Sequence, residues 1–252
     1  MAALPPAHVD LWSDRALVLA PLGSVARHAH AATALLIGLD GDFAIRWCGD
    51  WLRTRSALIP AGVAHELECG PTLMATLYLF PLTGEPEALA RRLGVDPQRT
   101  CVGVRLGAGV EASLLAIHGG DRQRAATRAW LDQLVGRVDR APVDPRIVET
   151  ASLLSQHAAD KLTLAELAER VGVSESRLMH LFKAEVGVPI RRFRLWERMR
   201  LLTEHVAAGD SLTMAALAAG FADSAHLSHG FRGMFGIPAS QILNAGSRLR
   251  AS

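Results

Sequence analysis

The sequence predicts an α+β protein with a β-rich N-terminal half and an all-α C-terminal half. Three observations predict this class. Short apolar runs broken by turns occupy residues 9–80, apolar residues recur every three or four positions from residue 85, and one two-helix pattern occurs twice after residue 144. A chain of 252 residues is long enough for two domains, and 50% hydrophobic with 21% charged residues is the balance of a folded globular protein.

Four runs of strand-forming residues stand in the N-terminal half, and turn residues such as Asp40-Gly41 separate them. We expect strands over residues 34–39, 42–47, 56–59 and 73–80.

Helical periodicity replaces this pattern from residue 85, and we expect helices over residues 85–93, 110–117 and 122–138. Trp130, Leu134 and Val138 recur at helical spacing in the last one. They suit either a dimer interface or packing onto the chain's own N-terminal half. Residues 141–145 form a Pro-containing linker, in which Asp144 can cap a following helix.

Residues 163–184 carry a helix-turn-helix pattern. Thr163 and Glu166 have capping-box spacing, Gly172 ends the first helix, and Ser174 can cap the second. Ala168 stands four residues before the glycine. Two helices that cross at a tight turn need a small side chain at the crossing and a residue tolerant of positive φ in the turn.

The same spacing returns over residues 212–235. Ser211 and Thr213 are helix caps, and Ala216 again stands four residues before a glycine, Gly220. Between the two units, residues 190–206 predict one long connecting helix, and residues 191–200 hold five arginines against one glutamate. The net charge of the chain is only +2, so the total charge does not indicate a nucleic-acid partner, whereas the clustering of arginines in this segment does.

The C-terminal part of the chain, over roughly residues 144–246 of the expected domain 144–250, closely resembles the AraC/XylS family of transcription regulators. Segments 187–189, 219–228 and 231–238 carry the resemblance; they read Gly-Val-Pro, Ala-Gly-Phe-Ala-Asp-Ser-Ala-His-Leu-Ser and Phe-Arg-Gly-Met-Phe-Gly-Ile-Pro. The resemblance implies a seven-helix domain whose two recognition helices enter successive major-groove segments of double-stranded DNA. It also implies transcription activation, RNA polymerase as a partner and a homodimer.

Matching to the family assigns the DNA-binding residues. In the first unit, His180 is expected to donate to a guanine, and in the second His226 either contacts a base or caps its own turn. Two positions depart from the family, because His229 and Gly233 stand where basic residues are usual, and Gly230 costs the helix about 1 kcal/mol. The expected groove residues are Glu175, Ser176, Arg177, Met179, His180, Ser224, Ala225, His226 and His229, and the expected phosphate contacts are Lys183, Arg191, Arg192 and Arg232.

The N-terminal residues 1–82 resemble the cupin family. The motif Arg27-His28-Ala29-His30 and the later Pro60-Ala61-Gly62-Val63-Ala64-His65 match its HxH and PxGxxH elements. The resemblance implies a β-barrel in which three histidines and a glutamate bind a divalent metal. The glutamate is missing here, so His28, His30 and His65 either hold a divalent transition metal by themselves, line an effector pocket or tie down the barrel mouth.

The expected architecture is a cupin-like barrel (1–82), a helical connector that could dimerise (83–140) and a DNA-binding domain (144–250). We expect a one-component transcription regulator that binds a small-molecule effector and has no catalytic residue. Two alternatives stay open: a metal-dependent cupin enzyme fused to a DNA-binding tail, and a thiol or metal sensor that uses Cys48 or Cys69 with His65. The sequence shows no signal peptide or membrane span, which predicts a cytoplasmic protein with reduced cysteines.

Overall fold

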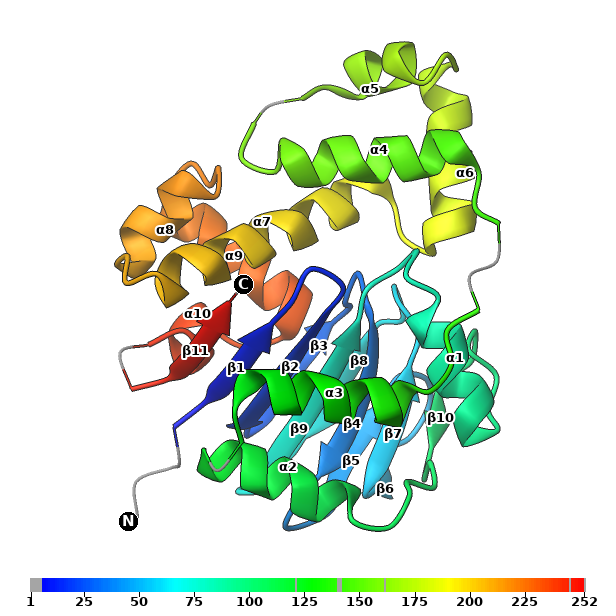
Figure 1. Ribbon diagram of the computed structural model, residues 1–252. Helices are drawn as coiled ribbons and strands as arrows, with labels where there is room; N and C mark the ends of the chain where they lie inside the picture. Colours follow the sequence, from blue (N-terminus) through cyan, green and yellow to red (C-terminus); the bar gives the residue numbers. More distant parts are fainter. Residues whose placement is uncertain (1–5, 121, 140–141, 161, 245, 252) are drawn as a thin grey trace.

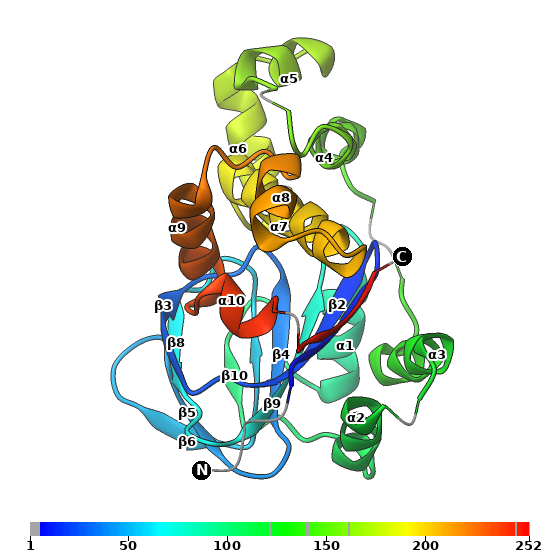
Figure 2. The same cartoon turned by 90° about the vertical axis from the view of Figure 1, so that its left-hand side faces the viewer.

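The computed structural model describes residues 6–120, 122–139, 142–160, 162–244 and 246–251, and it contains two facing β-sheets with helices on either side (Figures 1 and 2). The seven-stranded sheet has the order β10 (Cys101–Val102), β7 (Ser56–Ile59), β4 (Thr33–Gly38), β9 (Leu73–Leu79), β2 (Arg15–Pro21), β1 (His8–Leu11) and β11 (Arg248–Ala251). The four-stranded sheet has the order β3 (Ser24–His28), β8 (His65–Glu68), β5 (Phe43–Arg46) and β6 (Leu52–Thr54).

Both faces of the seven-stranded sheet are covered, which explains the continuous apolar runs of its strands. Every residue of β4 is buried, and its side chains alternate between two cores. Ala34 and Leu36 face the four-stranded sheet, whereas Leu35 and Ile37 face the outer helices. The four strands expected from the sequence are β4, β5, β7 and β9.

The outer helices are α1 (Glu85–Leu93), α2 (Val110–Gly119) and α3 (Arg124–Val135), and they lie on one face of the seven-stranded sheet (Figure 2). Leu131 and Leu134 of α3 are buried in the core that this face shares with the sheet. Of the three residues proposed for a dimer interface, Leu134 and Trp130 therefore pack on the chain's own sheet, and Val138 is exposed beyond the end of the helix.

The expected closed barrel is wrong: the described strands form two open sheets. Segments of the C-terminal half cover one edge of each sheet: the β1 edge of the seven-stranded sheet and the β3 edge of the four-stranded sheet. Strand β11 pairs with β1 in parallel, and the Gly236 carbonyl accepts a hydrogen bond of 3.0 Å from the Ala26 amide on the edge strand β3. The strand β11 is also a correction, because the sequence predicted only helices up to residue 250.

Seven helices follow residue 144 in the described part of the chain, as the AraC resemblance implied. Four of them begin at expected caps: Asp144 caps α4, Thr163 and Glu166 form a capping box on α5, and Ser174 and Ser211 cap α6 and α8. Thr213, also expected as a cap, lies inside α8. The first linker residue, Ala141, lies outside the described residues. The helices are α4 (Pro145–Gln156), α5 (Leu164–Arg170), α6 (Glu175–Val186), α7 (Ile190–Ala207), α8 (Leu212–Ala218), α9 (Ser224–Phe235) and α10 (Ala239–Ile242).

One core joins the inner faces of both sheets to α4–α10. The long helix α7 crosses this region, with α4–α6 at one end and α8–α10 at the other (Figure 1). Gly230 of α9 lies against it, and a Cβ atom there would come within 3.1 Å of Leu195 and 3.3 Å of Met199. The glycine that weakens α9 locally therefore permits a close approach of the two helices.

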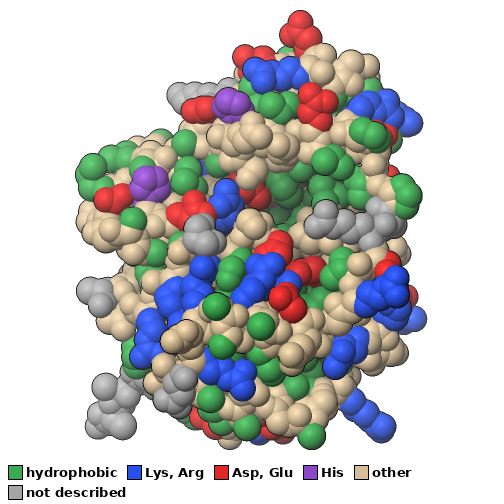
Figure 3. Space-filling model, viewed as in Figure 1, with side chains coloured by type: hydrophobic (Ala, Val, Ile, Leu, Met, Phe, Trp, Pro, Cys, Tyr) green, Lys and Arg blue, Asp and Glu red, His purple; other side chains and the backbone are tan. Residues whose placement is uncertain are grey.

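Ion pairs join α1, α3 and β11 to the large sheet. Charged side chains of both signs also gather on the surface of this side of the molecule (Figure 3). Arg15 pairs with Glu85, Arg128 pairs with Asp14, and the fully buried Asp10 accepts two hydrogen bonds from Arg250. In the described residues, no helix has both the length and the apolar character needed to cross a membrane.

Candidate nucleic-acid interface and sensor site

The first candidate recognition helix, α6, presents its expected DNA contacts to solvent. Leu178 and Phe182 bury one face, and this leaves the opposite face of the helix exposed. The Nδ1 atom of His180 donates to the Ser176 carbonyl at 2.7 Å, because a carbonyl can only accept. In the neutral ring, Nε2 is then an acceptor, so it suits an amino group of adenine or cytosine rather than the guanine expected from the sequence. Exposed residues on α6 are Glu175, Ser176, Arg177, Met179, His180 and Lys183.

The second candidate recognition helix, α9, has the opposite histidine tautomer. The Ala222 amide donates to Nδ1 of His226 at 3.3 Å, so the neutral ring carries its proton on Nε2. His226 thus caps its own turn and still offers a donor outward, which suits the guanine or thymine acceptors of the major groove. Exposed residues on α9 are Ser224, Ala225, His226, His229 and Arg232.

Arg191 and Arg192 begin helix α7, and their surroundings differ. Arg191 is exposed, as a phosphate contact requires. Arg192 is half-buried, and its guanidinium donates to the Ala29 carbonyl at 2.5 Å. Burial, followed by the charge of Arg191, lowers the pKa of Arg192. Its role as a phosphate contact stays a prediction, and one N–H of its guanidinium joins α7 to the sheets.

An apolar cavity of about 80 Å³ lies between the sheets and helices α7, α9 and α10. A single water needs only about 10–15 Å³ by this measure, so the cavity has room for a small molecule. Its walls combine Tyr78 and Phe80 from β9 and its end with Trp196 from α7 and Phe235 from α9. The one arginine in the wall, Arg200, is already paired with two glutamates of its own helix, Glu197 and Glu204.

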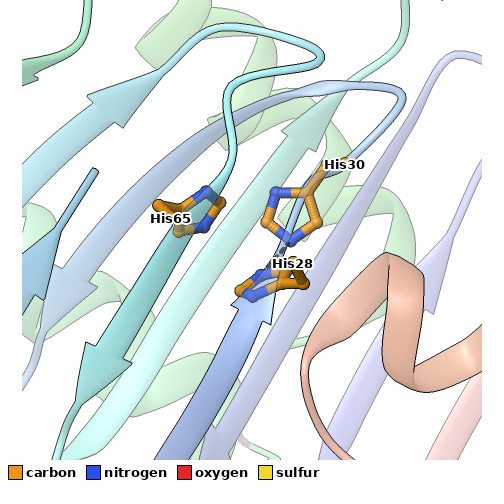
Figure 4. A group of neighbouring side chains, drawn as sticks. All are labelled: His28, His30 and His65. Carbon is orange, nitrogen blue, oxygen red and sulfur yellow. Dashed lines mark hydrogen bonds between the residues drawn. The ribbon is translucent and has the colours of Figure 1, made fainter. Parts of the chain in front are cut away.

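The three expected N-terminal histidines do come together (Figure 4). His28 ends β3 and lies opposite His65 of β8 in the strand register, and His30 follows in the loop after β3. The Nε2 atoms of His28 and His30 are 3.0 Å apart, and the ring centres of His28 and His65 are 4.3 Å apart. His28 and His30 also line the apolar cavity.

All three rings are buried and neutral. Burial is the main cause of the lowered pKa values, and it brings the pKa of His28 to about 3. The charges of Arg192 near His28 and His30, and of Arg27 near His65, act in the same direction. The buried Nε2 of His65 has no hydrogen-bond partner among the described residues. Such an orphaned polar atom costs about 1–3 kcal/mol.

The cysteines stand apart from this cluster. Cys48 is exposed, and Cys69 is buried; neither belongs to the group of neighbouring ligand atoms that the three histidines form. Burial raises the pKa of the Cys69 thiol to about 12, which keeps it protonated and unreactive.

The C-terminal half is similar in sequence to known regulatory proteins. Residues 167–245 match the family described as a helix-turn-helix domain. The bifunctional transcriptional activator/DNA repair enzyme Ada of Escherichia coli is 34% identical over 104 residues, which are 41% of this chain and 29% of Ada. The arabinose operon regulatory protein of the same organism is 28% identical over 161 residues, which are 61% of this chain and 49% of that protein.

Residues 167–245 are therefore a helix-turn-helix domain. We call residues 144–250 the AraC-type domain, after the family that their sequence resembles. The matched stretches span less than half the length of either curated relative. The resemblance noted in the sequence implied two recognition helices, and the structure has capped helices, α6 and α9, at those positions.

The fold of the whole chain is similar to that of ToxT from Vibrio cholerae. A structure of an apo ToxT variant has a TM-score of 0.61 at 11% identity and covers 93% of this chain and 100% of ToxT. A structure of ToxT with an unsaturated fatty acid bound has a TM-score of 0.59 at 10% identity and covers 95% of this chain and 99% of ToxT. At 10–11% sequence identity, this similarity shows a shared fold and nothing more.

Sequence reasoning missed the residues through which the AraC-type domain contacts the sheets. Trp196 and Phe235 both line the cavity beside Tyr78. A wide apolar face on α7, beyond what one small helical domain needs, is the signal that could have indicated a second packing partner.

Proposed function

We propose that this protein is a bacterial one-component transcription regulator that binds double-stranded DNA through α6 and α9 and senses a small apolar molecule in the cavity beside α7. The observation that carries the proposal is the pair of exposed, capped recognition helices on the AraC-type domain. Their N-terminal amides and Lys183, Arg191 and Arg232 supply donors for phosphates on either side of the groove.

The two histidine tautomers give each recognition helix a different base preference. His180 offers an acceptor and His226 offers a donor. We therefore propose that, on the strand each ring contacts, His180 of α6 favours adenine or cytosine and His226 of α9 favours guanine or thymine. The two contacts would lie about ten base pairs apart on one face of the duplex.

The cavity favours an apolar effector because aromatic and aliphatic side chains dominate its walls and the charge of Arg200 is already balanced. ToxT, whose fold this chain shares, has been crystallised with an unsaturated fatty acid. An unsaturated fatty acid is therefore the first probe. A ligand in this cavity contacts α7, α9 and the sheets. It can shift α9 only if it binds more tightly to one position of α9 than to another.

The remaining partners follow from this role. We propose a homodimer, RNA polymerase as the partner in activation, and a cytoplasmic location with the DNA. We also propose that the chain is not an enzyme. The DNA-repair activity named for Ada belongs to a protein of which only 29% is matched here.

DNA selection followed by footprinting tests the proposal. Random duplexes bound by the full chain should share a two-part site, and each part should be protected on the same face of the DNA. A double variant, His180→Ala with His226→Ala, should lose the shared site but keep weak salt-sensitive binding. Duplexes without any common sequence, recovered equally by wild type and double variant, would refute sequence-specific regulation.

A substitution that fills the cavity with a larger side chain tests effector binding separately from DNA binding. Thr203 lines the cavity, so Thr203→Trp should abolish the rise in melting temperature that an unsaturated fatty acid produces in the wild type. Thr213→Trp, at an exposed position on α8, is the matched control and should leave that rise intact. The absence of any shift in the wild type would rule out this class of effector.

A further inference from the structure

The three buried histidines lie where the sheets meet the AraC-type domain. We propose that His28, His30 and His65 bind one divalent transition metal ion, and that this ion fastens the AraC-type domain to the sheets. The metal site extends the proposed function, but its test needs no DNA, so either idea can fail without the other.

The donor atoms are arranged for one small ion. The three ligand atoms all lie within 4.8 Å of one another. Nε2 of His30 donates a hydrogen bond of 3.0 Å to Nε2 of His28, and a bound ion would replace this proton between the two nitrogens. Two imidazole nitrogens on one tetrahedral zinc ion lie about 3.3 Å apart, given bonds of about 2.0–2.1 Å. Small rotations of the rings bring the three nitrogens to that spacing.

Hydrogen bonds orient two of the rings as metal ligands are oriented. Nδ1 of His28 donates to the Ala26 carbonyl at 2.8 Å, and Nδ1 of His65 donates to the Val63 carbonyl at 3.0 Å. Each bond fixes the tautomer that leaves a lone pair on Nε2, and such backbone partners are the usual second shell of zinc-bound histidine. Without an ion, Nε2 of His65 is buried and has no partner among the described residues.

The donor set selects the class of metal. Three neutral imidazoles suit zinc, nickel, cobalt or copper, whereas calcium and magnesium prefer oxygen ligands. The hydroxyl of Tyr78 lies 3.4 Å from Nε2 of His30 and offers an oxygen for a fourth position. His28, His30 and Tyr78 also line the apolar cavity, so a fourth ligand could equally be a group of the effector.

The backbone that carries the histidines also holds the AraC-type domain. The Ala26 amide donates to Gly236 at the end of α9, and Arg192 of α7 donates to the Ala29 carbonyl. A Cβ atom at Gly236 would lie 2.7 Å from Nδ1 of His28, which shows how closely α9 approaches the ring. An ion that fixes this loop therefore stabilises the contacts that hold α7 and α9 in place.

Metal titration of the full chain, purified without a histidine tag and stripped with a chelator, tests the site. We expect one equivalent of Zn²⁺ to bind, and Co²⁺ to give the visible absorption of a tetrahedral site. His65→Ala should weaken Zn²⁺ binding at least tenfold. His8→Ala, which removes a buried histidine outside the cluster, should bind Zn²⁺ as the wild type does.

Hydrogen exchange tests the fastening. Zn²⁺ should slow exchange of the Ala26 amide at least tenfold in the wild type and leave it unchanged in the His65→Ala variant. If His65→Ala does not fold, His30→Gln serves in its place, with circular dichroism as the check of folding. Equal Zn²⁺ binding by the wild type and a folded histidine variant overturns the site, and bound Zn²⁺ without slower exchange at Ala26 overturns the fastening.

Discussion

Acid should unfold the metal-free protein through its buried histidine cluster. The pKa of His28 is about 3 in the folded chain because burial disfavours its charged form, whereas an exposed histidine in the unfolded chain titrates near 6.5. The unfolded chain therefore binds protons more tightly, so the stability is fully present above pH 6.5 and is lost as the pH falls toward 3.

The size of this loss follows from the two pKa values. Each pH unit between them changes the free energy of unfolding by about 1.4 kcal/mol, so a shift from pH 7 to pH 5 costs about 2 kcal/mol through His28 alone. His30 and His65 act in the same direction, since burial lowers both pKa values. Against a typical total stability of about 5–15 kcal/mol, this is a large fraction.

Urea denaturation at several pH values, in the presence of a chelator, measures the effect. The midpoint should fall steeply below pH 6.5, and His28→Gln should show a shallower fall because it removes one titrating ring. A stability that stays flat between pH 7 and pH 5, or an equal slope in the variant, would show that these rings are not buried in the neutral form.

Two further comparisons test the DNA-binding domain. His180→Ala should cost about 1–3 kcal/mol on the selected site and relax the preference at one base pair, whereas Arg191→Ala should weaken all duplexes alike and lower the salt slope by about one unit; binding titrations that show the reverse would place the groove face elsewhere. Gly172→Ala should cost about 1–2 kcal/mol through its positive φ alone. Gly220→Ala should cost more in urea denaturation, since its Cβ atom would also lie 2.4 Å from the Ala159 carbonyl oxygen, and equal losses would contradict the packing described for the second turn.

The local signals in the sequence predicted the AraC-type domain well, because each helix there begins and ends with a residue that acts within a few positions. Thr163 with Glu166, Ser174 and Asp144 form the caps that their spacing indicated. The histidine cluster was also predictable, since two residues of an HxH motif and a third after PxG are brought together by strand pairing.

The open sheets could not be predicted in this way, because long-range contacts decide them. Strand β11 pairs with β1 across almost the whole chain, and the edge of β3 is covered by Gly236. Nothing near residue 26 or residue 248 indicates these partners. The hydrogen bond between Arg192 and the Ala29 carbonyl could not be predicted for the same reason, since the two residues lie 163 positions apart in the sequence.

The salt dependence of DNA binding by the full chain tests the central claim most directly. Affinity for the selected duplex should exceed that for a scrambled duplex by at least a hundredfold, and both affinities should fall steeply with rising salt because phosphate contacts release counterions. Equal affinities for the two duplexes at every salt concentration, or no binding to either at low salt, would contradict a sequence-specific regulator that reads DNA through α6 and α9.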